Sequence, residues 1–170
     1  MYGMFANMLL AGRANMGDWI DILLDELDIK TAIESVSHPD AGGIDVFIGV
    51  TRSEKRADGV ELLALDYEAY NEMAVEQMKT LLEAAKATWP ICRAAILHRV
   101  GRVAIGQASV VIVVSCPHRG QAFEACRYLI DELKKSVTIW KKEVWADSTA
   151  NWSERSEMVR NDEARSPNEE

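Results

Sequence analysis

Basic residues gather in one stretch of an otherwise acidic sequence. A His-Arg pair at 118–119 stands at the start of a predicted helix, a Lys-Lys pair at 134–135 stands at its end, and a second Lys-Lys pair at 141–142 follows on a predicted strand. Residues 92–142 hold nine Lys and Arg against three Asp and Glu, whereas the whole chain has a net charge of −8. This concentration predicts a site for a small anion rather than for a long nucleic acid.

The first candidate element is Ser115-Cys116-Pro117-His118-Arg119, where a buried strand leads into a helix. Backbone N–H groups and the dipole at a helix start attract anions, and an adjacent Arg offers a bidentate partner for phosphate. In the alternative interpretation, Ser115 or His118 caps the helix and Arg119 is merely solvated.

The second candidate is the pair Lys134 and Lys141. Nearby cations disfavour the charged form of a lysine, so its pKa falls and it can serve as a nucleophile or a general acid/base. The competing interpretation is two solvated surface lysines. Arg52, in the loop after the strand predicted at 44–50, is a third candidate, because loops held by rigid strands often carry function. An isolated loop Arg can equally be solvated.

Two further groups favour structural roles. The run His98-Arg99-Val100-Gly101 at a strand end predicts a buried polar contact and a glycine turn. Cys116 and His118 could form a thiol–imidazole pair, but a strand-end Cys is more often a small, inert apolar residue. The three cysteines include no CxxC pair, so neither a disulfide framework nor a metal site is expected, and we expect a reducing cytoplasm.

The length of the predicted helix limits how these groups can act together. His118 and Lys134 are sixteen positions apart, which on one helix separates them by about 24 Å. One small substrate cannot touch both in one chain. If both serve one site, that site is built from two chains related by a two-fold axis.

The elements that position these residues follow from periodicity. Strands are predicted at 18–24, 44–50, 60–67, 92–100, 107–115 and 138–145, with a turn at 101–106. A short helix is predicted from an Asp28 cap through Ser37, and long helices at 71–89 and 118–135. The first long helix, with Asn71 as its cap, should bury Met73, Ala74, Met78, Leu81, Leu82 and Ala85. Paired strands interrupted by two long helices favour an α+β domain over a doubly wound sheet.

The totals fit one globular domain of 170 residues. We predict a poorly ordered N-terminal extension at 1–17, one folded domain at 18–152 and a polar tail at 153–170, within a stretch from Ala146 onward that frays. Residues 1–12 are too short to span a bilayer and lack the basic start of a signal peptide. A pI near 5.0 argues against general nucleic-acid binding, so neither a membrane nor nucleic acid is an expected partner.

At these residues the sequence resembles the large, catalytic subunit of molybdopterin synthase, the MoaE family. The matching segments are AGGIDVFIGVTR at 41–52, LDYEAYNEMA at 65–74 and ILHRVGRVAIGQASVVIVVSCPHRGQAFEACRYLIDELKKSVTIWKKE at 96–143. They stand in family order with compatible spacing. Departures include Thr138, where the family usually has Pro, and Cys116-Pro117, where small residues are usual.

The resemblance implies an α/β-hammerhead-type domain with an additional antiparallel sheet and two long helices. It implies a sulfurtransferase that needs no cofactor and moves two sulfurs onto cyclic pyranopterin monophosphate to form the molybdopterin dithiolene. The sulfur donor would be a separate ubiquitin-like carrier with a C-terminal Gly-Gly thiocarboxylate. A homodimer of large subunits, each binding one carrier, would make a heterotetramer. The alternative is a carrier-binding or pterin-binding scaffold without turnover.

The resemblance also assigns site residues by position. Lys134 and Lys141 would lie closest to the chemistry, Lys134 at the thiocarboxylate carbonyl and Lys141 with Arg52 at the anionic groups of the substrate. His118 and Arg119 would come from the partner subunit. Arg155, a few residues after Trp152, is a further candidate. The predicted substrate-binding set is Val50, Thr51, Arg52, His118, Arg119, Lys134, Lys141, Lys142 and Glu143.

Overall fold

The computed structural model describes residues 17–152 and contains two four-stranded sheets. The sheet whose strands together hold more residues, called the larger sheet below, forms the centre of the fold. Its strand order is β1 (Trp19–Leu23), β4 (Arg93–Arg99), β6 (Ala108–Cys116) and β2 (Gly43–Val50). β1 runs parallel to β4, and the other neighbours are antiparallel. β2 therefore forms an open edge of this sheet.

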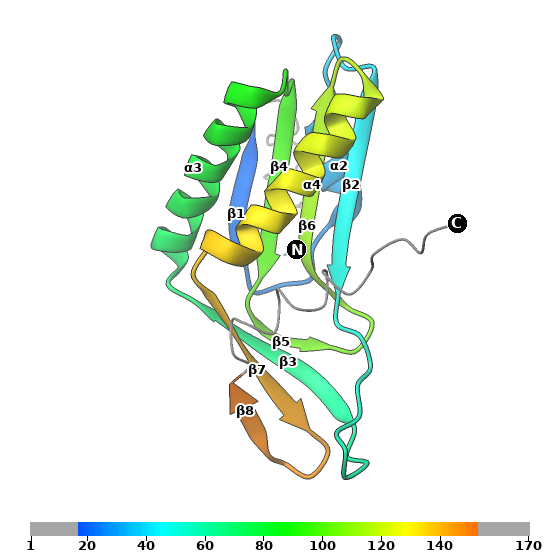
Figure 1. The fold of residues 1–170 in the computed structure, drawn as a ribbon, viewed down its shortest axis with the longest axis vertical. Helices are drawn as coiled ribbons and strands as arrows, with labels where there is room; N and C mark the ends of the chain where they lie inside the picture. Colours follow the sequence, from blue (N-terminus) through cyan, green and yellow to red (C-terminus); the bar gives the residue numbers. More distant parts are fainter. Residues whose placement is uncertain (1–16, 153–170) are drawn as a thin grey trace, which may run out of the picture.

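Helices cover both faces of the larger sheet (Figure 1). α3 (Asn71–Thr88) and α4 (Arg119–Ser136) lie side by side on one face, and the short α2 (Ile29–Ser35) lies on the other. The apolar residues of α3 recur at helical spacing, and Ala74, Met78, Leu81, Leu82 and Ala85 are buried in the main core. Met73 does not join them: it is 39% exposed, so its predicted burial is wrong.

The smaller sheet lies beyond the C-terminal end of α4 (Figure 1). Its order is β5 (Gly101–Ala104), β3 (Leu62–Ala69), β7 (Ile139–Trp145) and β8 (Ala150–Trp152), and all its pairs are antiparallel. The predicted α+β architecture, with an additional antiparallel sheet and two long helices, is confirmed.

Two strands of the smaller sheet were not predicted. β5 occupies most of the turn expected at 101–106, because Gly101, at φ +78°, redirects the chain out of β4 and Val103 then becomes fully buried against β3. β8 lies in the stretch expected to fray from residue 146 onward. Its three exposed residues have little pattern of their own, and pairing with β7 orders them.

The helix starts match the predictions in part. The Asp28 side chain accepts a hydrogen bond from the Thr31 amide at 3.0 Å and caps α2, as predicted. The cap of α3 is Tyr70 rather than Asn71, which is the first helical residue. The predicted extension, apart from residue 17, and the predicted tail at 153–170 with Arg155 lie outside the described residues.

Candidate active site

A cavity of about 450 Å³ lies where the two sheets meet the C-terminal end of α4. Its walls come from β2 and the loop after it, from β3, β4, β6 and β7, and from the last turns of α4. Charged and polar side chains share the lining with apolar ones. The polar lining residues are Arg52, Glu54, Tyr67, His98, Ser109, Lys134, Lys141 and Glu143.

Lys134 and Lys141 reach this cavity from different elements. Lys134 stands in the last turn of α4, which ends at the Val137 cap. The chain then turns into β7, where alternation places Ile139, Lys141 and Glu143 on the face toward the cavity. Two of the predicted lysines and the predicted glutamate therefore line one site.

Lys142 lies on the other face of β7. Its ammonium stands 5.6 Å from the centre of the Trp152 ring on β8, within cation–π distance. It pairs in register with Asp66 and Trp152 and is not among the residues that line the cavity. The structure does not bring the predicted Lys142 to the site with its neighbour.

The loop after β2 adds a third cation. Val50 and Arg52 line the cavity, and Val50 is 56% exposed at its rim. Thr51 is not among the lining residues: it is buried, and its backbone pairs with Gln107 and Gly106 at 3.0 and 2.7 Å. Thr51 thus anchors the loop, and its neighbours on both sides face the cavity.

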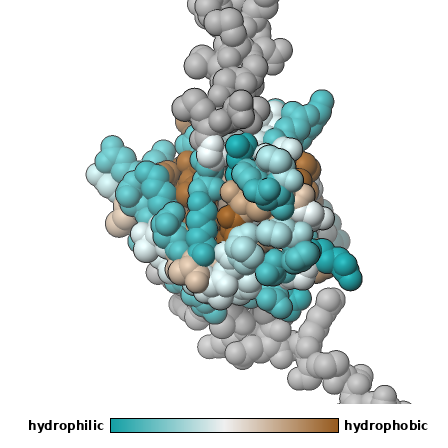
Figure 2. Space-filling model, turned by 90° about the horizontal axis from the view of Figure 1, so that it is seen from above, coloured by the Kyte–Doolittle hydropathy of each residue, from teal (hydrophilic) through white to brown (hydrophobic). Residues whose placement is uncertain are grey.

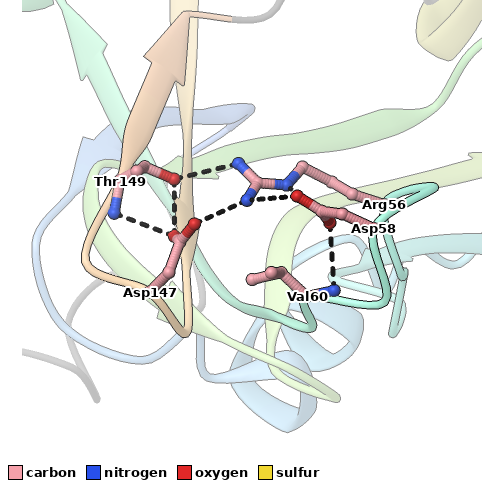
Figure 3. A network of polar contacts seen from close by, with 5 residues as sticks. All are labelled: Arg56, Asp58, Val60, Asp147 and Thr149. Carbon is pink, nitrogen blue, oxygen red and sulfur yellow. Dashed lines mark hydrogen bonds and ion pairs between the residues drawn. The ribbon is translucent and has the colours of Figure 1, made fainter.

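Arg56 ties the same loop to the hairpin that follows β7 (Figure 3). Its guanidinium donates to the carboxylates of Asp147 at 2.5 Å and Asp58 at 3.1 Å and to the Thr149 hydroxyl at 3.0 Å. It also stacks 5.0 Å from the centre of the Trp145 ring. Because this loop carries Arg52 and β7 carries Lys141, the Arg56 network holds two sides of the cavity together.

The Asp147 carboxylate is the most strongly perturbed acid in this network. Hydrogen bonds from the Thr149 hydroxyl and amide, followed by Arg56, lower the pKa of Asp147 from 3.8 to about 2. Asp147 is therefore ionised throughout the neutral range. No sequence motif marked either Arg56 or Asp147, because the contact joins positions 91 residues apart.

His118 and Arg119 lie at the opposite end of α4 from Lys134, as the helix length predicted (Figure 1). Neither lines the cavity. Seen from above, onto the end where α4 begins, the surface is mostly hydrophilic, with apolar atoms showing between polar side chains near its centre (Figure 2). Because they lie at the far end of α4, His118 and Arg119 do not reach Lys134 and Lys141 of the same chain.

The capping interpretation of this segment is correct in part. His118 is the N-cap residue of α4 and Arg119 is exposed, but the His118 side chain makes no capping bond. The Ser115 hydroxyl instead bonds the backbone of Arg93 on β4. Gly42 and Gly43 pack so tightly against the start of α4 that a Cβ on Gly42 would stand 2.3 Å from the Pro117 oxygen. The AGG turn thus fixes where α4 begins.

Cys116 is poorly suited to nucleophilic chemistry. It is fully buried, and burial together with the neighbouring Cys92 thiol raises its pKa to about 11. Within residues 17–152, no group of three or more His, Cys, Asp or Glu side chains could hold a metal ion. None of the helices in this range is long and apolar enough to span a membrane.

Some lining residues had no assigned chemistry in the sequence. Glu54 carried no signal beyond its place in the loop. His98 is buried, as predicted, and with Tyr67 and Ser109 it lines the cavity. These three stand on different strands, so only the assembled fold brings them together.

Comparison with known proteins agrees with the motifs. The family model described as "MoaE protein" matches residues 22–136. A molybdopterin synthase catalytic subunit of Thermoplasma volcanium is 42% identical over 134 residues, which cover 79% of this chain and 96% of that protein. One of Drosophila willistoni is 41% identical over 145 residues and 84% of this chain, but the chain spans only 38% of its length.

Solved structures show the same fold. The crystal structure of molybdopterin synthase from Staphylococcus aureus matches with a TM-score of 0.75 and 32% identity, over 79% of this chain and 96% of that one. A complex of subunits 1 and 2 of molybdopterin-converting factor from Helicobacter pylori matches in fold, with a TM-score of 0.66 and 22% identity, over 79% and 89%. The match to the family model and to these relatives confirms the predicted resemblance: the chain belongs to the MoaE family of molybdopterin synthase catalytic subunits.

Proposed function

We propose that this chain transfers two sulfurs from the thiocarboxylated C-terminus of a ubiquitin-like carrier onto cyclic pyranopterin monophosphate, forming the molybdopterin dithiolene. The observation that carries the proposal is the joint lining of one cavity by Lys134, Lys141 and Arg52. Three cations around one cavity suit a phosphorylated substrate and an anionic sulfur donor. The free cysteines suit the expected cytoplasmic location.

The three cations take different roles in this proposal. Lys134, at the end of a helix, meets the carbonyl of the carrier's thiocarboxylate and handles protons there. Lys141 and Arg52, on β7 and the loop opposite, bind the anionic groups of the pterin. Because sulfur arrives on the carrier, the chain needs no nucleophilic cysteine, and this agrees with the burial of Cys116.

The complete site is proposed to draw His118 and Arg119 from a second copy of the chain. These residues stand about 24 Å along α4 from Lys134. An antiparallel α4 from a two-fold partner brings its first turn beside Lys134, and the same contact is repeated at the other site. A homodimer with one carrier on each subunit then makes the expected heterotetramer.

The face for this second copy is the groove between α4 and β2. A second cavity of about 590 Å³ lies there and shares Phe47, Ile130 and Lys134 with the first. β2 is an open sheet edge, and Ile44, Ile48 and Phe123 expose 42%, 40% and 55% of their surface. Apolar side chains beside the open edge of a strand favour a protein partner over bulk water.

Reconstitution with purified components tests the reaction. The chain is mixed with thiocarboxylated carrier and cyclic pyranopterin monophosphate, and the dithiolene is read as its fluorescent oxidised pterin. We expect product from the wild type and none from Lys134→Ala. A wild-type protein that binds both partners without forming product would instead support the non-catalytic scaffold.

A complementation experiment tests the two-chain site. Arg119→Ala and Lys134→Ala each remove a different contributor, so each homodimer is inactive. In randomly mixed dimers half are hybrids, and each hybrid has one intact site, which predicts about one quarter of wild-type activity. Activity no higher than that of the two separate variants would contradict a site shared between subunits.

A further inference from the structure

The most deeply buried polar part of the main cavity, which we call the inner wall, is neutral, whereas the rest of the lining carries the cations Arg52, Lys134 and Lys141 and the carboxylates Glu54 and Glu143. His98 on β4 and Ser109 on β6 are each only 5% exposed, and both line the cavity together with Tyr67 of β3. The Tyr67 and His98 rings meet edge to face, with their centres 5.1 Å apart. The roles proposed above for the rim cations leave this inner wall without a function.

The hydrogen bonding of His98 defines its tautomer. Nδ1 lies 2.8 Å from the Arg99 carbonyl oxygen, which can only accept, so Nδ1 carries the proton. Burial lowers the pKa of His98 to about 4, and the ring is neutral at physiological pH. Among the described residues this is the only hydrogen bond of the ring. Nε2 is therefore a bare acceptor and the polar atom that His98 can present to the cavity.

Tyr67 and Ser109 use their own protons within the wall. The Tyr67 hydroxyl donates to Ser109 Oγ at 3.4 Å, and the Ser109 hydroxyl donates to the Gly49 carbonyl at 3.4 Å. Burial raises the pKa of Tyr67, so its hydroxyl stays protonated. The wall thus offers acceptor lone pairs at Tyr67 Oη and His98 Nε2. A ligand anion would be repelled there, whereas a ligand donor would be bound.

We propose that His98 Nε2 accepts a hydrogen bond from an N–H group of the ligand that enters this cavity, and so selects which end of the ligand points inward. Anionic groups then remain at the rim with Arg52, Lys134 and Lys141. The inference rests on the proposed function, whose two ligands both carry such donors: the pterin ring and the backbone amides of the carrier's C-terminal Gly-Gly segment. The shared chemistry is an uncharged N–H donor.

Nitrogen NMR of protein labelled with ¹⁵N-histidine tests the contact without turnover. The chain has three histidines, and loss of one signal in His98→Gln identifies the bare Nε2 of His98. The pterin is added without a sulfur donor, and separately the carrier is added in its unreactive carboxylate form. We expect the His98 Nε2 signal to move upfield with one of them, and that ligand is then the source of the N–H group.

Two results of this titration have different meanings. If a ligand binds by calorimetry while the His98 Nε2 signal stays unmoved with both ligands, the His98 contact is wrong and the proposed function stands. If neither ligand binds, both the proposed function and the contact fail.

Matched variants separate recognition from stability. His98→Phe keeps a ring but removes the acceptor, and we expect affinity for the ligand that moves the NMR signal to fall about tenfold. His98→Gln keeps an acceptor and should retain most of that affinity. Leu97→Val is the control, because Leu97 is the next residue on β4 but packs into the opposite core. Equal losses of affinity in all three variants would show that His98 supports the structure and does not bind the ligand through Nε2.

Discussion

Lys141 and Lys142 are adjacent in the sequence, yet β7 places their side chains on opposite faces. Lys141 lines the cavity, and the Lys142 ammonium stacks 5.6 Å from the centre of the Trp152 ring. The separation follows from the two-residue period of a strand. Of the two lysines in the WKKE motif, only the first is available to a ligand in this chain's main cavity.

This arrangement predicts unequal effects of two neighbouring substitutions. Lys141→Ala should lower kcat/KM for sulfur transfer about 100-fold or more, because in the proposed function it removes a charge that binds the anionic substrate. Lys142→Ala should lower it less than about fivefold, since only an exposed cation–π contact is lost. Steady-state kinetics with the reconstituted carrier measures both. Equal losses would show that the strand register differs when ligands are bound.

Lys134 and Lys135 offer a second matched pair, at the end of α4. Lys134 lines the cavity, whereas Lys135 forms an exposed ion pair with Glu132 at 3.0 Å. Lys134→Ala should reduce the single-turnover rate about 100-fold or more, in the range of a lost general acid/base, while Lys135→Ala should change it less than about twofold. Rapid-quench measurement with saturating carrier distinguishes the two. If Lys134→Ala reacts at nearly the wild-type rate, Lys134 takes no part in the chemical step.

The Arg56 network predicts an acid-dependent contribution to stability. The pKa of Asp147 falls from 3.8 to about 2 on folding, so its ionised form stabilises the folded protein fully above about pH 3.8. That contribution is lost as the pH falls from about 3.8 toward 2. Asp147→Asn should therefore lower Tm at pH 7 and at pH 5 by the same amount, and by less at pH 3. Glu61→Gln, which breaks the exposed ion pair between Glu61 and Lys55, is the control for the change in Tm on losing a surface ion pair.

The buried thiols predict that sulfur transfer does not depend on cysteine. Cys116 and Cys126 are buried with pKa values raised to about 11 and about 12, so neither forms a thiolate at neutral pH. Cys116→Ala should keep the wild-type rate and cost about 1 kcal/mol of unfolding free energy. Treatment of the native protein with iodoacetamide should likewise leave activity intact. Inactivation by either change would instead support a catalytic thiol–imidazole pair of Cys116 and His118.

Local patterns were sufficient for most of the elements and for the chemistry. Helical spacing located α3 and α4, Asp28 was visible as a cap, alternating apolar residues located β2, and a continuous run of β-branched residues located β6. The spacing between His118 and Lys134 already separated them, because a helix has a constant rise per residue. Each of these features depends on residues close together in the chain.

What needed the tertiary structure were the relations between distant segments. β5 and β8 are strands because β3 and β7 offer partners, not because of their own short sequences. The inward placement of Lys141, the Arg56–Asp147 bridge and the bare Nε2 of His98 depend on register, packing and tautomer. Local periodicity limits what each segment can form, whereas the burial of sheets and helices against one another selects which side chains share a cavity.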